Sequence, residues 1–258
     1  MHIQKQRKKY SMKKKYGLVG KNISYSFSRG YFRDKFKSEN IENVVYQNFD
    51  LPDIAEFPFI TYHREEEFGG FNVTIPYKQS IIRYLSEVDK IAEEIGAVNT
   101  IKITEDYKLI GYNTDCYGFE TSLKPLLKSS HKKALILGTG GASKAVSYVL
   151  KTLGIEHVFV SRTPKNSSTI SYDFLDEKII QDYTVIINCS PVGTHPNMDE
   201  CPAIPYEFIT KEHLLYDLIY NPEETTFLGK GKAVGATIKN GHEMLELQAE
   251  KSWEIWNS

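Results

Sequence analysis

Ala134-Leu135-Ile136-Leu137-Gly138-Thr139-Gly140-Gly141-Ala142 joins a short apolar run to a glycine-rich turn. Four consecutive apolar residues are typical of a strand buried on both faces of a parallel sheet. A helical segment through Leu150 follows the turn. Gly138 permits the tight turn, and Gly140 lets a pyrophosphate approach backbone N–H groups at the helix N-terminus. These residues predict a dinucleotide-binding unit, although Ser143 stands at the third position of the strict glycine fingerprint.

More apolar runs alternate with helical segments after this turn. We expect strands at His157–Val160, Thr184–Asn188 and Leu214–Tyr220. Strands that alternate with helices form βαβ units in a parallel sheet. The pattern therefore predicts a doubly wound, Rossmann-type α/β domain.

The N-terminal half has a mixed pattern that predicts a separate α/β domain. Strands are expected at Tyr16–Gly20, Val44–Phe49 and Gly70–Ile75, with a hairpin formed by Val98–Ile103 and Lys108–Tyr112. Helices are expected at Tyr31–Ser38 and Ser86–Ile95, with Ser86 as the capping residue of the second. Two more helices are expected outside this half, at Phe119–Leu127 and at His242–Trp256. Apolar residues in the last helix indicate that it packs back onto the first domain. We therefore assign residues 16–115, with about 236–258, to a substrate-binding catalytic domain, and residues 116–235 to a nucleotide-binding domain.

Composition limits the function classes. The chain has 258 residues, 41% of them hydrophobic, and a net charge of -1, so it has no overall field that would attract nucleic acid or a membrane surface. No apolar run is long enough to span a membrane. Three scattered cysteines indicate reduced thiols in a cytoplasm, and neither they nor the histidines have the spacing of metal ligands. We expect a cytoplasmic protein that acts on a small molecule, as a monomer or a homodimer.

Residues 1–15 are rich in lysine and contain no acidic residue. A secretory signal would need an apolar stretch after these charges, and none follows. The segment is best interpreted as a disordered basic tail, and Met12 is an alternative start. The alternative interpretation of this basic segment is an arm that binds nucleic acid.

Three polar signatures precede the glycine-rich turn: Asn72–Lys78 (NVTIPYK), Gly96–Thr100 (GAVNT) and Gly111–Asp115 (GYNTD). Pro76 stops a strand and suits the first turn of a helix, so Lys78 is expected at a strand-to-helix junction. Alone, Lys78 would be read as an exposed helix lysine. Asn99 and Asp115, however, also follow predicted strands, where function concentrates in α/β sheets. A lysine beside an aspartate provides a proton donor for an alkoxide and a partner that fixes its position, so the chain is predicted to be a dehydrogenase.

The residues after His157–Val160 indicate which cofactor is used. An NAD enzyme usually has an acidic residue there for the ribose 2′-hydroxyl. This chain has Ser161-Arg162-Thr163 instead. A guanidinium can pair with a 2′-phosphate, so we predict NADP. The alternative is that Arg162 is a solvated surface residue.

Taken together, the motifs resemble the shikimate dehydrogenase family from about Tyr16 onward. The resemblance rests on Ser26-Phe27-Ser28, Asn72–Lys78, Gly96–Thr100, Gly111–Asp115, Gly138–Ala142, Ser161–Thr163 and Asn240–Gln248, in that order. No one of these motifs is specific, but the ordered combination is. The resemblance implies NADPH-dependent, reversible reduction of 3-dehydroshikimate to shikimate, a step in aromatic amino acid biosynthesis.

The resemblance also implies roles for individual residues. Lys78 and Asp115 would be the catalytic pair. The substrate carboxylate would be held by Ser26 and Ser28, the ring hydroxyls by Asn99, Asp115 and Gln248, and the rest of the pocket by Thr74 and Tyr220. The cofactor would be held by Gly138, Gly140, Gly141, Ala142, Ser161, Arg162, Thr163, Asn188, Ser190 and Gly241, with the segment from Asn188 to Ser190 on the nicotinamide side.

The sequence departs from the family pattern at three places. Arg29-Gly30 replaces a proline after the paired serines, Ser161 replaces an asparagine, and His242-Glu243 stands where small or apolar residues are common. Two related alternatives remain open: a quinate/shikimate dehydrogenase that uses NAD, and a non-catalytic regulator of the same fold. An intact Lys78 and Asp115 argue against the regulator.

Overall fold

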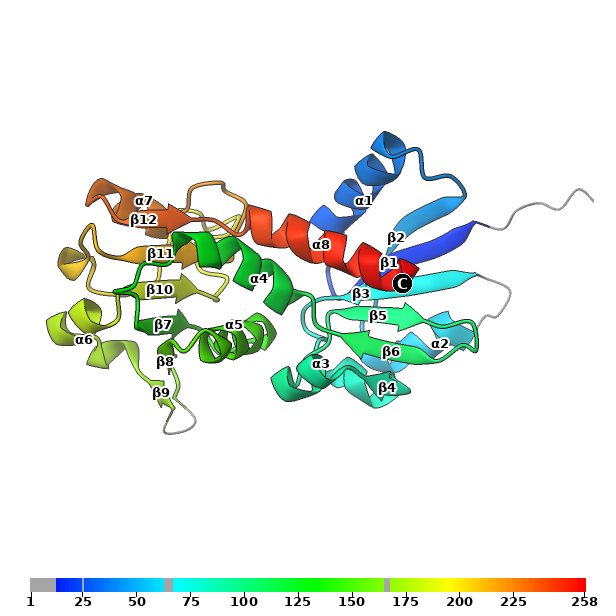
Figure 1. Cartoon of the computed structure of the whole chain (residues 1–258), viewed down its shortest axis with the longest axis horizontal. Coiled ribbons are helices and arrows are strands. Elements are labelled where there is room, and N and C mark those ends of the chain that lie inside the picture. Colours follow the sequence, from blue (N-terminus) through cyan, green and yellow to red (C-terminus); the bar gives the residue numbers. More distant parts are fainter. Residues whose placement is uncertain (1–12, 25, 63–66, 165–167) are drawn as a thin grey trace, which may run out of the picture.

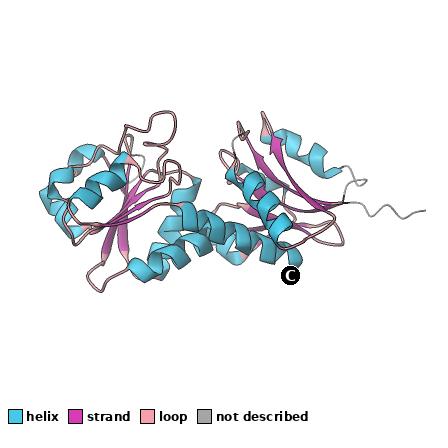
Figure 2. Cartoon of the chain, turned by 90° about the horizontal axis from the view of Figure 1, so that it is seen from above, coloured by secondary structure: helices cyan, strands magenta, loops and turns pink. Residues whose placement is uncertain are grey.

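The structure is a computed structural model, which describes residues 13–24, 26–62, 67–164 and 168–258. Two six-stranded sheets lie next to each other along the long axis, and helices α4 and α8 run between them (Figures 1 and 2). The first twelve residues of the predicted basic tail lie outside the described residues. The two-domain α/β architecture predicted from the sequence is confirmed.

The first sheet has the order β2-β1-β3-β5-β6-β4. Its strands are β1 (Lys14–Gly20), β2 (Val44–Asp50), β3 (Phe68–Val73), β4 (Glu87–Val88), β5 (Thr100–Ile103) and β6 (Leu109–Tyr112). β1 is parallel to β2 and β3, whereas β5 is antiparallel to β3 and β6, which confirms the predicted hairpin. β1 begins at Lys14, so the predicted tail of residues 1–15 reaches too far: the backbones of Lys14 and Lys15 pair with β2 despite their charged side chains.

Helices α1 (Phe27–Ser38), α2 (Phe57–Tyr62) and α3 (Lys90–Ile95) belong to the first domain. α1 begins at Phe27 and not at the predicted Tyr31, which places Ser28 in its first turn. The prediction that Ser86 caps a helix is wrong. Its hydroxyl accepts a hydrogen bond from the Leu109 N–H of β6 (3.2 Å), and the Asp89 carboxylate caps α3 by accepting from the Ile91 N–H (3.0 Å).

The second sheet is wholly parallel and has the order β12-β11-β10-β7-β8-β9. Its strands are β7 (Lys133–Leu137), β8 (Glu156–Val160), β9 (Thr169–Ile170), β10 (Val185–Asn188), β11 (Leu214–Asp217) and β12 (Thr237–Lys239). This is the strand order of the doubly wound dinucleotide fold, which confirms the prediction. Because β12 pairs with β11, the chain returns to the first domain only after Lys239, later than the predicted boundary near residue 236.

The order of strand addition reverses between β7 and β10. In open α/β sheets, ligands bind beyond the carboxyl ends of the strands at such a point. The helices that complete this half are α4 (Asp115–Leu123), α5 (Gly141–Thr152), α6 (Glu177–Asp182), α7 (Thr226–Ala233) and α8 (His242–Asn257). α4 begins at Asp115, four residues before the predicted start at Phe119.

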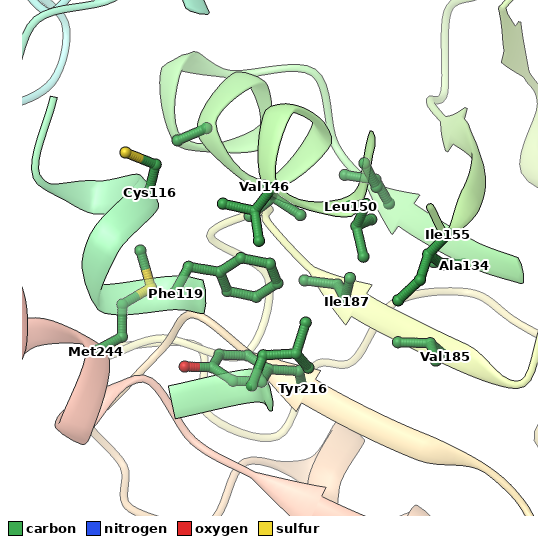
Figure 3. Close-up of a cluster of buried hydrophobic side chains, with 14 of the residues drawn as sticks. Cys116, Phe119, Ala134, Val146, Leu150, Ile155, Val185, Ile187, Tyr216 and Met244 are labelled. Carbon is green, nitrogen blue, oxygen red and sulfur yellow. The ribbon is translucent and has the colours of Figure 1, made fainter. Parts of the chain in front are cut away.

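Helix α8 contributes to the hydrophobic cores of both domains. Met244, near its start, packs in the core that covers the second sheet, beside Phe119 of α4 and Tyr216 of β11 (Figure 3). Ala249 and Trp256 pack in a core of the first domain. The C-terminal helix therefore packs back onto the first domain, as predicted, and also ties that domain to the second.

Trp256 is the far anchor of α8. Its side chain is 3% exposed, and its indole N–H donates a hydrogen bond to the Ile101 carbonyl of β5 (2.9 Å). Its ring lies 4.8 Å from that of Tyr16 on β1. An aromatic ring that is both buried and hydrogen-bonded fixes the position of the helix on the sheet. Over the described residues, none of the helices has the length and apolar character needed to cross a membrane.

We predict that Gly118→Ala destabilises the protein by about 1–3 kcal/mol through overpacking between α4 and α8. A Cβ at this position would collide with the Met244 carbonyl oxygen and lie 3.2 Å from Gln248 Cβ. Urea unfolding measures the effect. Gly30→Ala in α1 is the control, because no atom lies within 4 Å of its added Cβ, and alanine there is expected to stabilise by about 0.5–1 kcal/mol. A Gly118→Ala protein as stable as wild type would contradict the close helix packing.

Candidate active site

Lys78 and Asp115 lie in direct contact between the two domains. Lys78 follows β3 and precedes a 3₁₀ turn, and its carbonyl accepts a hydrogen bond from the Val98 N–H (2.7 Å). Asp115 is the first residue of α4. Lys78 Nζ donates to Asp115 Oδ2 at 2.6 Å, and the side chains are only 14% and 7% exposed. The predicted meeting of the two residues is confirmed. Pro76, however, follows a cis peptide bond and does not begin the helix that was expected there.

Asn99 and Gln248 complete a cluster around Asp115. The Asn99 side-chain amide can donate to Asp115 Oδ1 (2.9 Å) and to Gln248 Oε1 (3.0 Å). Its carbonyl oxygen accepts from the Thr114 N–H (2.7 Å). Each oxygen of the Asp115 carboxylate therefore has its own donor, one from Lys78 and one from Asn99. Three segments of the first domain's sequence and the C-terminal helix meet at this point.

A buried polar network supports the cluster from behind. The Asn72 side chain accepts from Tyr46 OH (2.8 Å) and donates to Ser252 Oγ (2.9 Å), which in turn lies 2.8 Å from Thr100 Oγ1. Thr114 Oγ1 lies within hydrogen-bond distance of both hydroxyls (3.2 Å). Sequence reasoning missed these supporting roles. Asn72, Thr100 and Thr114 lie inside motifs that could have indicated them, whereas Tyr46 and Ser252 carry no such signal.

The paired serines lie at the start of α1. Ser26 stands at the capping position, but its side chain makes no capping hydrogen bond. The Ser28 side chain lies near the Tyr46 hydroxyl and partly offsets the increase in the pKa of Tyr46 caused by burial. Ser28 thus lies near Tyr46, which binds Asn72 of the network behind Lys78 and Asp115.

Phe27, between the two serines, reaches residues of the second half of the chain. Its ring lies 5.5 Å from that of Tyr220 and 5.6 Å from that of His242, both edge-on. The structure thus brings Tyr220 to the serine pair, and it gives His242, a departure from the family pattern, a packing partner. Thr74 lies directly after β3, where its N–H donates to the Val19 carbonyl (2.9 Å).

The glycine-rich turn has the geometry of an anion site. Gly138 has φ of 112°, and a Cβ there would lie 3.2 Å from the Cys189 backbone. Gly140 caps α5 and has open space where a Cβ would be. The N–H groups and the dipole of α5 favour negative charge at this end of the helix, where Ala142 follows Gly141. A Cβ on Gly141 would lie 3.6 Å from Lys78 Cβ, so the turn lies beside Lys78.

Two other predicted cofactor segments lie at the same carboxyl edge of the sheet. Asn188, the last residue of β10, is buried, and its side-chain carbonyl oxygen accepts from the Ser190 N–H (3.0 Å) and hydroxyl (2.7 Å). After β8, the Ser161 hydroxyl accepts from the Thr163 N–H (3.2 Å). The exposed Arg162 is close enough to Tyr172 to offset part of the burial-induced increase in the pKa of that phenol.

Gly241, the remaining predicted cofactor position, is packed against backbone. A Cβ there would collide with the Leu218 carbonyl group, and the Gly241 N–H donates to the Ile219 carbonyl (3.0 Å). The glycine is thus required where α8 approaches the segment after β11. This close approach holds the start of α8 beside Tyr220.

Comparisons with known proteins point to one family. A sequence model of the shikimate dehydrogenase substrate binding domain matches residues 18–101. Shikimate dehydrogenase (NADP(+)) of Clostridium botulinum is 39% identical over 248 residues, which cover 93% of this chain and 95% of that protein. The crystal structure of shikimate dehydrogenase 1 from Peptoclostridium difficile has a TM-score of 0.81 at 38% identity, covering 95% of this chain and 91% of the other. The enzyme from Thermus thermophilus, in complex with NADP(H) and shikimate, has a TM-score of 0.83 at 28% identity, covering 94% and 93%.

Proposed function

The chain belongs to the shikimate dehydrogenase family, and we propose that Lys78 and Asp115 carry out its reaction, the reversible, NADPH-dependent reduction of 3-dehydroshikimate to shikimate. The observation that carries this proposal is the position of Lys78, which binds Asp115 and lies beside the glycine-rich turn. One side chain thus lies between a group of substrate ligands and a nucleotide-binding turn. A dehydrogenase needs its proton donor at such a place.

The proposed roles follow from the chemistry of each group. When bound, NADPH supplies hydride to the carbonyl carbon of the substrate. Lys78 donates a proton to the oxygen as it becomes an alkoxide, and in the oxidative direction it accepts that proton. Asp115 orients the ammonium group through Oδ2 and leaves Asn99 to fix Oδ1. Because both side chains are nearly buried, solvent screens their attraction only weakly.

The domains have separate tasks in this proposal. Residues 16–115 together with α8 hold the substrate, which is supported by the match of residues 18–101 to a substrate-binding domain. Ser26 and Ser28 bind the carboxylate, remote from the reacting carbon. Asn99, Asp115 and Gln248 bind ring hydroxyls, and Thr74 and Tyr220 line the pocket. The remaining residues, through β12, form the NADP domain.

The fit to NADP rests on the shape and charge of the carboxyl edge of the second sheet. The open side of Gly140, at the N-terminus of α5, accommodates a pyrophosphate. Arg162 lies exposed beyond β8, where no acidic residue stands to hold a ribose 2′-hydroxyl. A guanidinium at this position favours a 2′-phosphate.

Replacing Lys78 by alanine is expected to remove the proton donor while leaving most substrate contacts. Loss of a general acid typically costs about 10²–10⁴-fold, and the loss is expected mainly in kcat. Steady-state kinetics with shikimate and NADP measure it. Lys132→Ala, an exposed lysine of the same chain, is the control and is expected to retain wild-type kcat. Near-normal kcat in Lys78→Ala would exclude Lys78 as the proton donor.

The double variant Ser26→Ala, Ser28→Ala is expected to raise KM for shikimate much more than it lowers kcat. Each hydrogen bond to a charged carboxylate is worth about 1.5–3 kcal/mol. Binding of the alcohol analogue of shikimate, which lacks the carboxylate, provides the control. If the variant weakens shikimate and the alcohol equally, the serines shape the start of α1 and do not bind the carboxylate.

The function itself is tested by absorbance at 340 nm with shikimate or quinate and with NADP or NAD. We expect shikimate with NADP to be the best pair. A guanidinium–phosphate contact of about 1.5–3 kcal/mol corresponds to a roughly ten- to hundredfold preference for NADP in kcat/KM. Arg162→Ala is expected to erase most of this preference and to leave NAD kinetics nearly unchanged. Equal losses with both cofactors would mean that Arg162 does not read the phosphate, and faster turnover of quinate with NAD would favour the alternative enzyme.

A further inference from the structure

Asp217 is a buried carboxylate to which the proposed chemistry gives no role. It ends β11, and it is 0% exposed. Burial raises its pKa to about 6, while hydrogen bonds from Thr225, Ile219 and Asn188 limit the increase. The three donors that face its two oxygens favour the ionised carboxylate. An ionised carboxylate is retained in a protein interior only when its oxygens have donors.

The donors to Asp217 come from three different segments at the carboxyl edge of the sheet. Oδ1 accepts from the Asn188 side-chain amide (3.0 Å), at the end of β10, and from the Ile219 N–H (3.0 Å), after β11. Oδ2 accepts from the Thr225 hydroxyl (2.7 Å), at the capping position of α7. One carboxylate thus fixes the relative positions of all three segments.

The segment after β10 depends on Asp217 through Asn188. With its amide held by Asp217, Asn188 turns its carbonyl oxygen to the Ser190 N–H and hydroxyl. The Asn188 amide also reaches the Val192 carbonyl (3.3 Å). The Cys189 and Ser190 backbone lies directly against Gly138 of the glycine-rich turn. Asp217 therefore determines where this segment lies relative to the turn.

The segment after β11 depends on Asp217 more directly. The Ile219 N–H is bound to the carboxylate, and the Ile219 carbonyl accepts from Gly241 at the start of α8. The next residue is Tyr220, whose ring contacts that of Phe27, between Ser26 and Ser28. The same carboxylate therefore holds one wall of the cofactor site and one wall of the substrate site.

We infer that Asp217 is a positioning residue, which fixes the Asn188–Val192 and Ile219–Tyr220 segments around the nicotinamide half of NADP. The inference rests on the proposed function, because it takes from it which half of the cofactor lies there. The groups that bind Asp217 lie at the end of β10 or after β11, whereas Ser161, Arg162 and Thr163 follow β8, beyond the intervening β7. The adenosine half is therefore expected to be indifferent to Asp217.

The test is Asp217→Asn, assayed by binding and by kinetics. Asparagine keeps the shape but presents an NH₂ group to three donors, so at least one of them loses its acceptor. We expect NADP to bind about tenfold more weakly or worse, as measured by calorimetry, and kcat to fall. Adenosine 2′,5′-bisphosphate, which has the 2′-phosphate but lacks the nicotinamide half, is expected to bind within about twofold of wild type.

Two further variants separate positioning from general damage. Ile180→Val removes a methylene group from a buried residue of the same domain, in α6, and is expected to lower stability without changing NADP affinity. Thr225→Val removes one donor to Asp217 and is expected to weaken NADP less than Asp217→Asn does, again sparing the bisphosphate. It also provides the test if Asp217→Asn does not fold.

Parallel loss of NADP and bisphosphate binding in these variants would overturn the inference, and so would NADP affinity equal to that of wild type. Selective loss of NADP binding supports it. The proposed function is judged separately, from turnover by the wild-type enzyme. A wild-type protein that does not oxidise shikimate with NADP would refute that function, whatever the variants do.

Discussion

The ion pair between Lys78 and Asp115 is the interaction on which the arrangement of the site depends. Two nearly buried charges are stable only when each has a close partner and when the remaining polar atoms are satisfied. The structure meets both conditions, because Asn99 takes the second carboxylate oxygen and the Val98 N–H holds the Lys78 backbone. Asp115 also opens α4, where the helix dipole favours a negative charge. The end of β3 is thereby held to the helix that leads into the nucleotide-binding domain.

Hydrophobic packing supports this ion pair from both domains. α4 inserts Phe119 into the core over the second sheet, and α8 lies against α4 with Gly118 at the point of closest approach. Gln248 and Ser252 reach the polar cluster from the same helix. Small displacements of α8 would therefore move the polar side chains around Asp115 as well as core residues. The packing of α8 against α4 thus determines where Gln248 and Ser252 lie.

Local sequence patterns predicted the features that local chemistry determines. The turn from Gly138 to Ala142 and the strands that precede Lys78 and Asp115 were visible because glycine and apolar runs act over a few residues. The prediction that Ser86 caps a helix failed because its hydroxyl accepts a hydrogen bond from Leu109 of β6. The residues next to Ser86 in the sequence do not reveal this partner. Distant pairings were invisible for the same reason: Asn72 and Ser252 are 180 residues apart, and Asp217 acquires its role only when three segments meet.

The anchoring of Trp256 has a consequence for how the protein is made. Every strand of the first sheet precedes α4 in the sequence, yet its core includes a ring that is synthesised 155 residues after Ile101, its hydrogen-bond partner. Domains generally fold in the order in which they leave the ribosome. Here the first domain to emerge must wait, with Tyr16 and the Ile101 carbonyl unpartnered by Trp256, while the whole nucleotide-binding domain is translated. The first domain to be synthesised is therefore the last to complete its hydrophobic core.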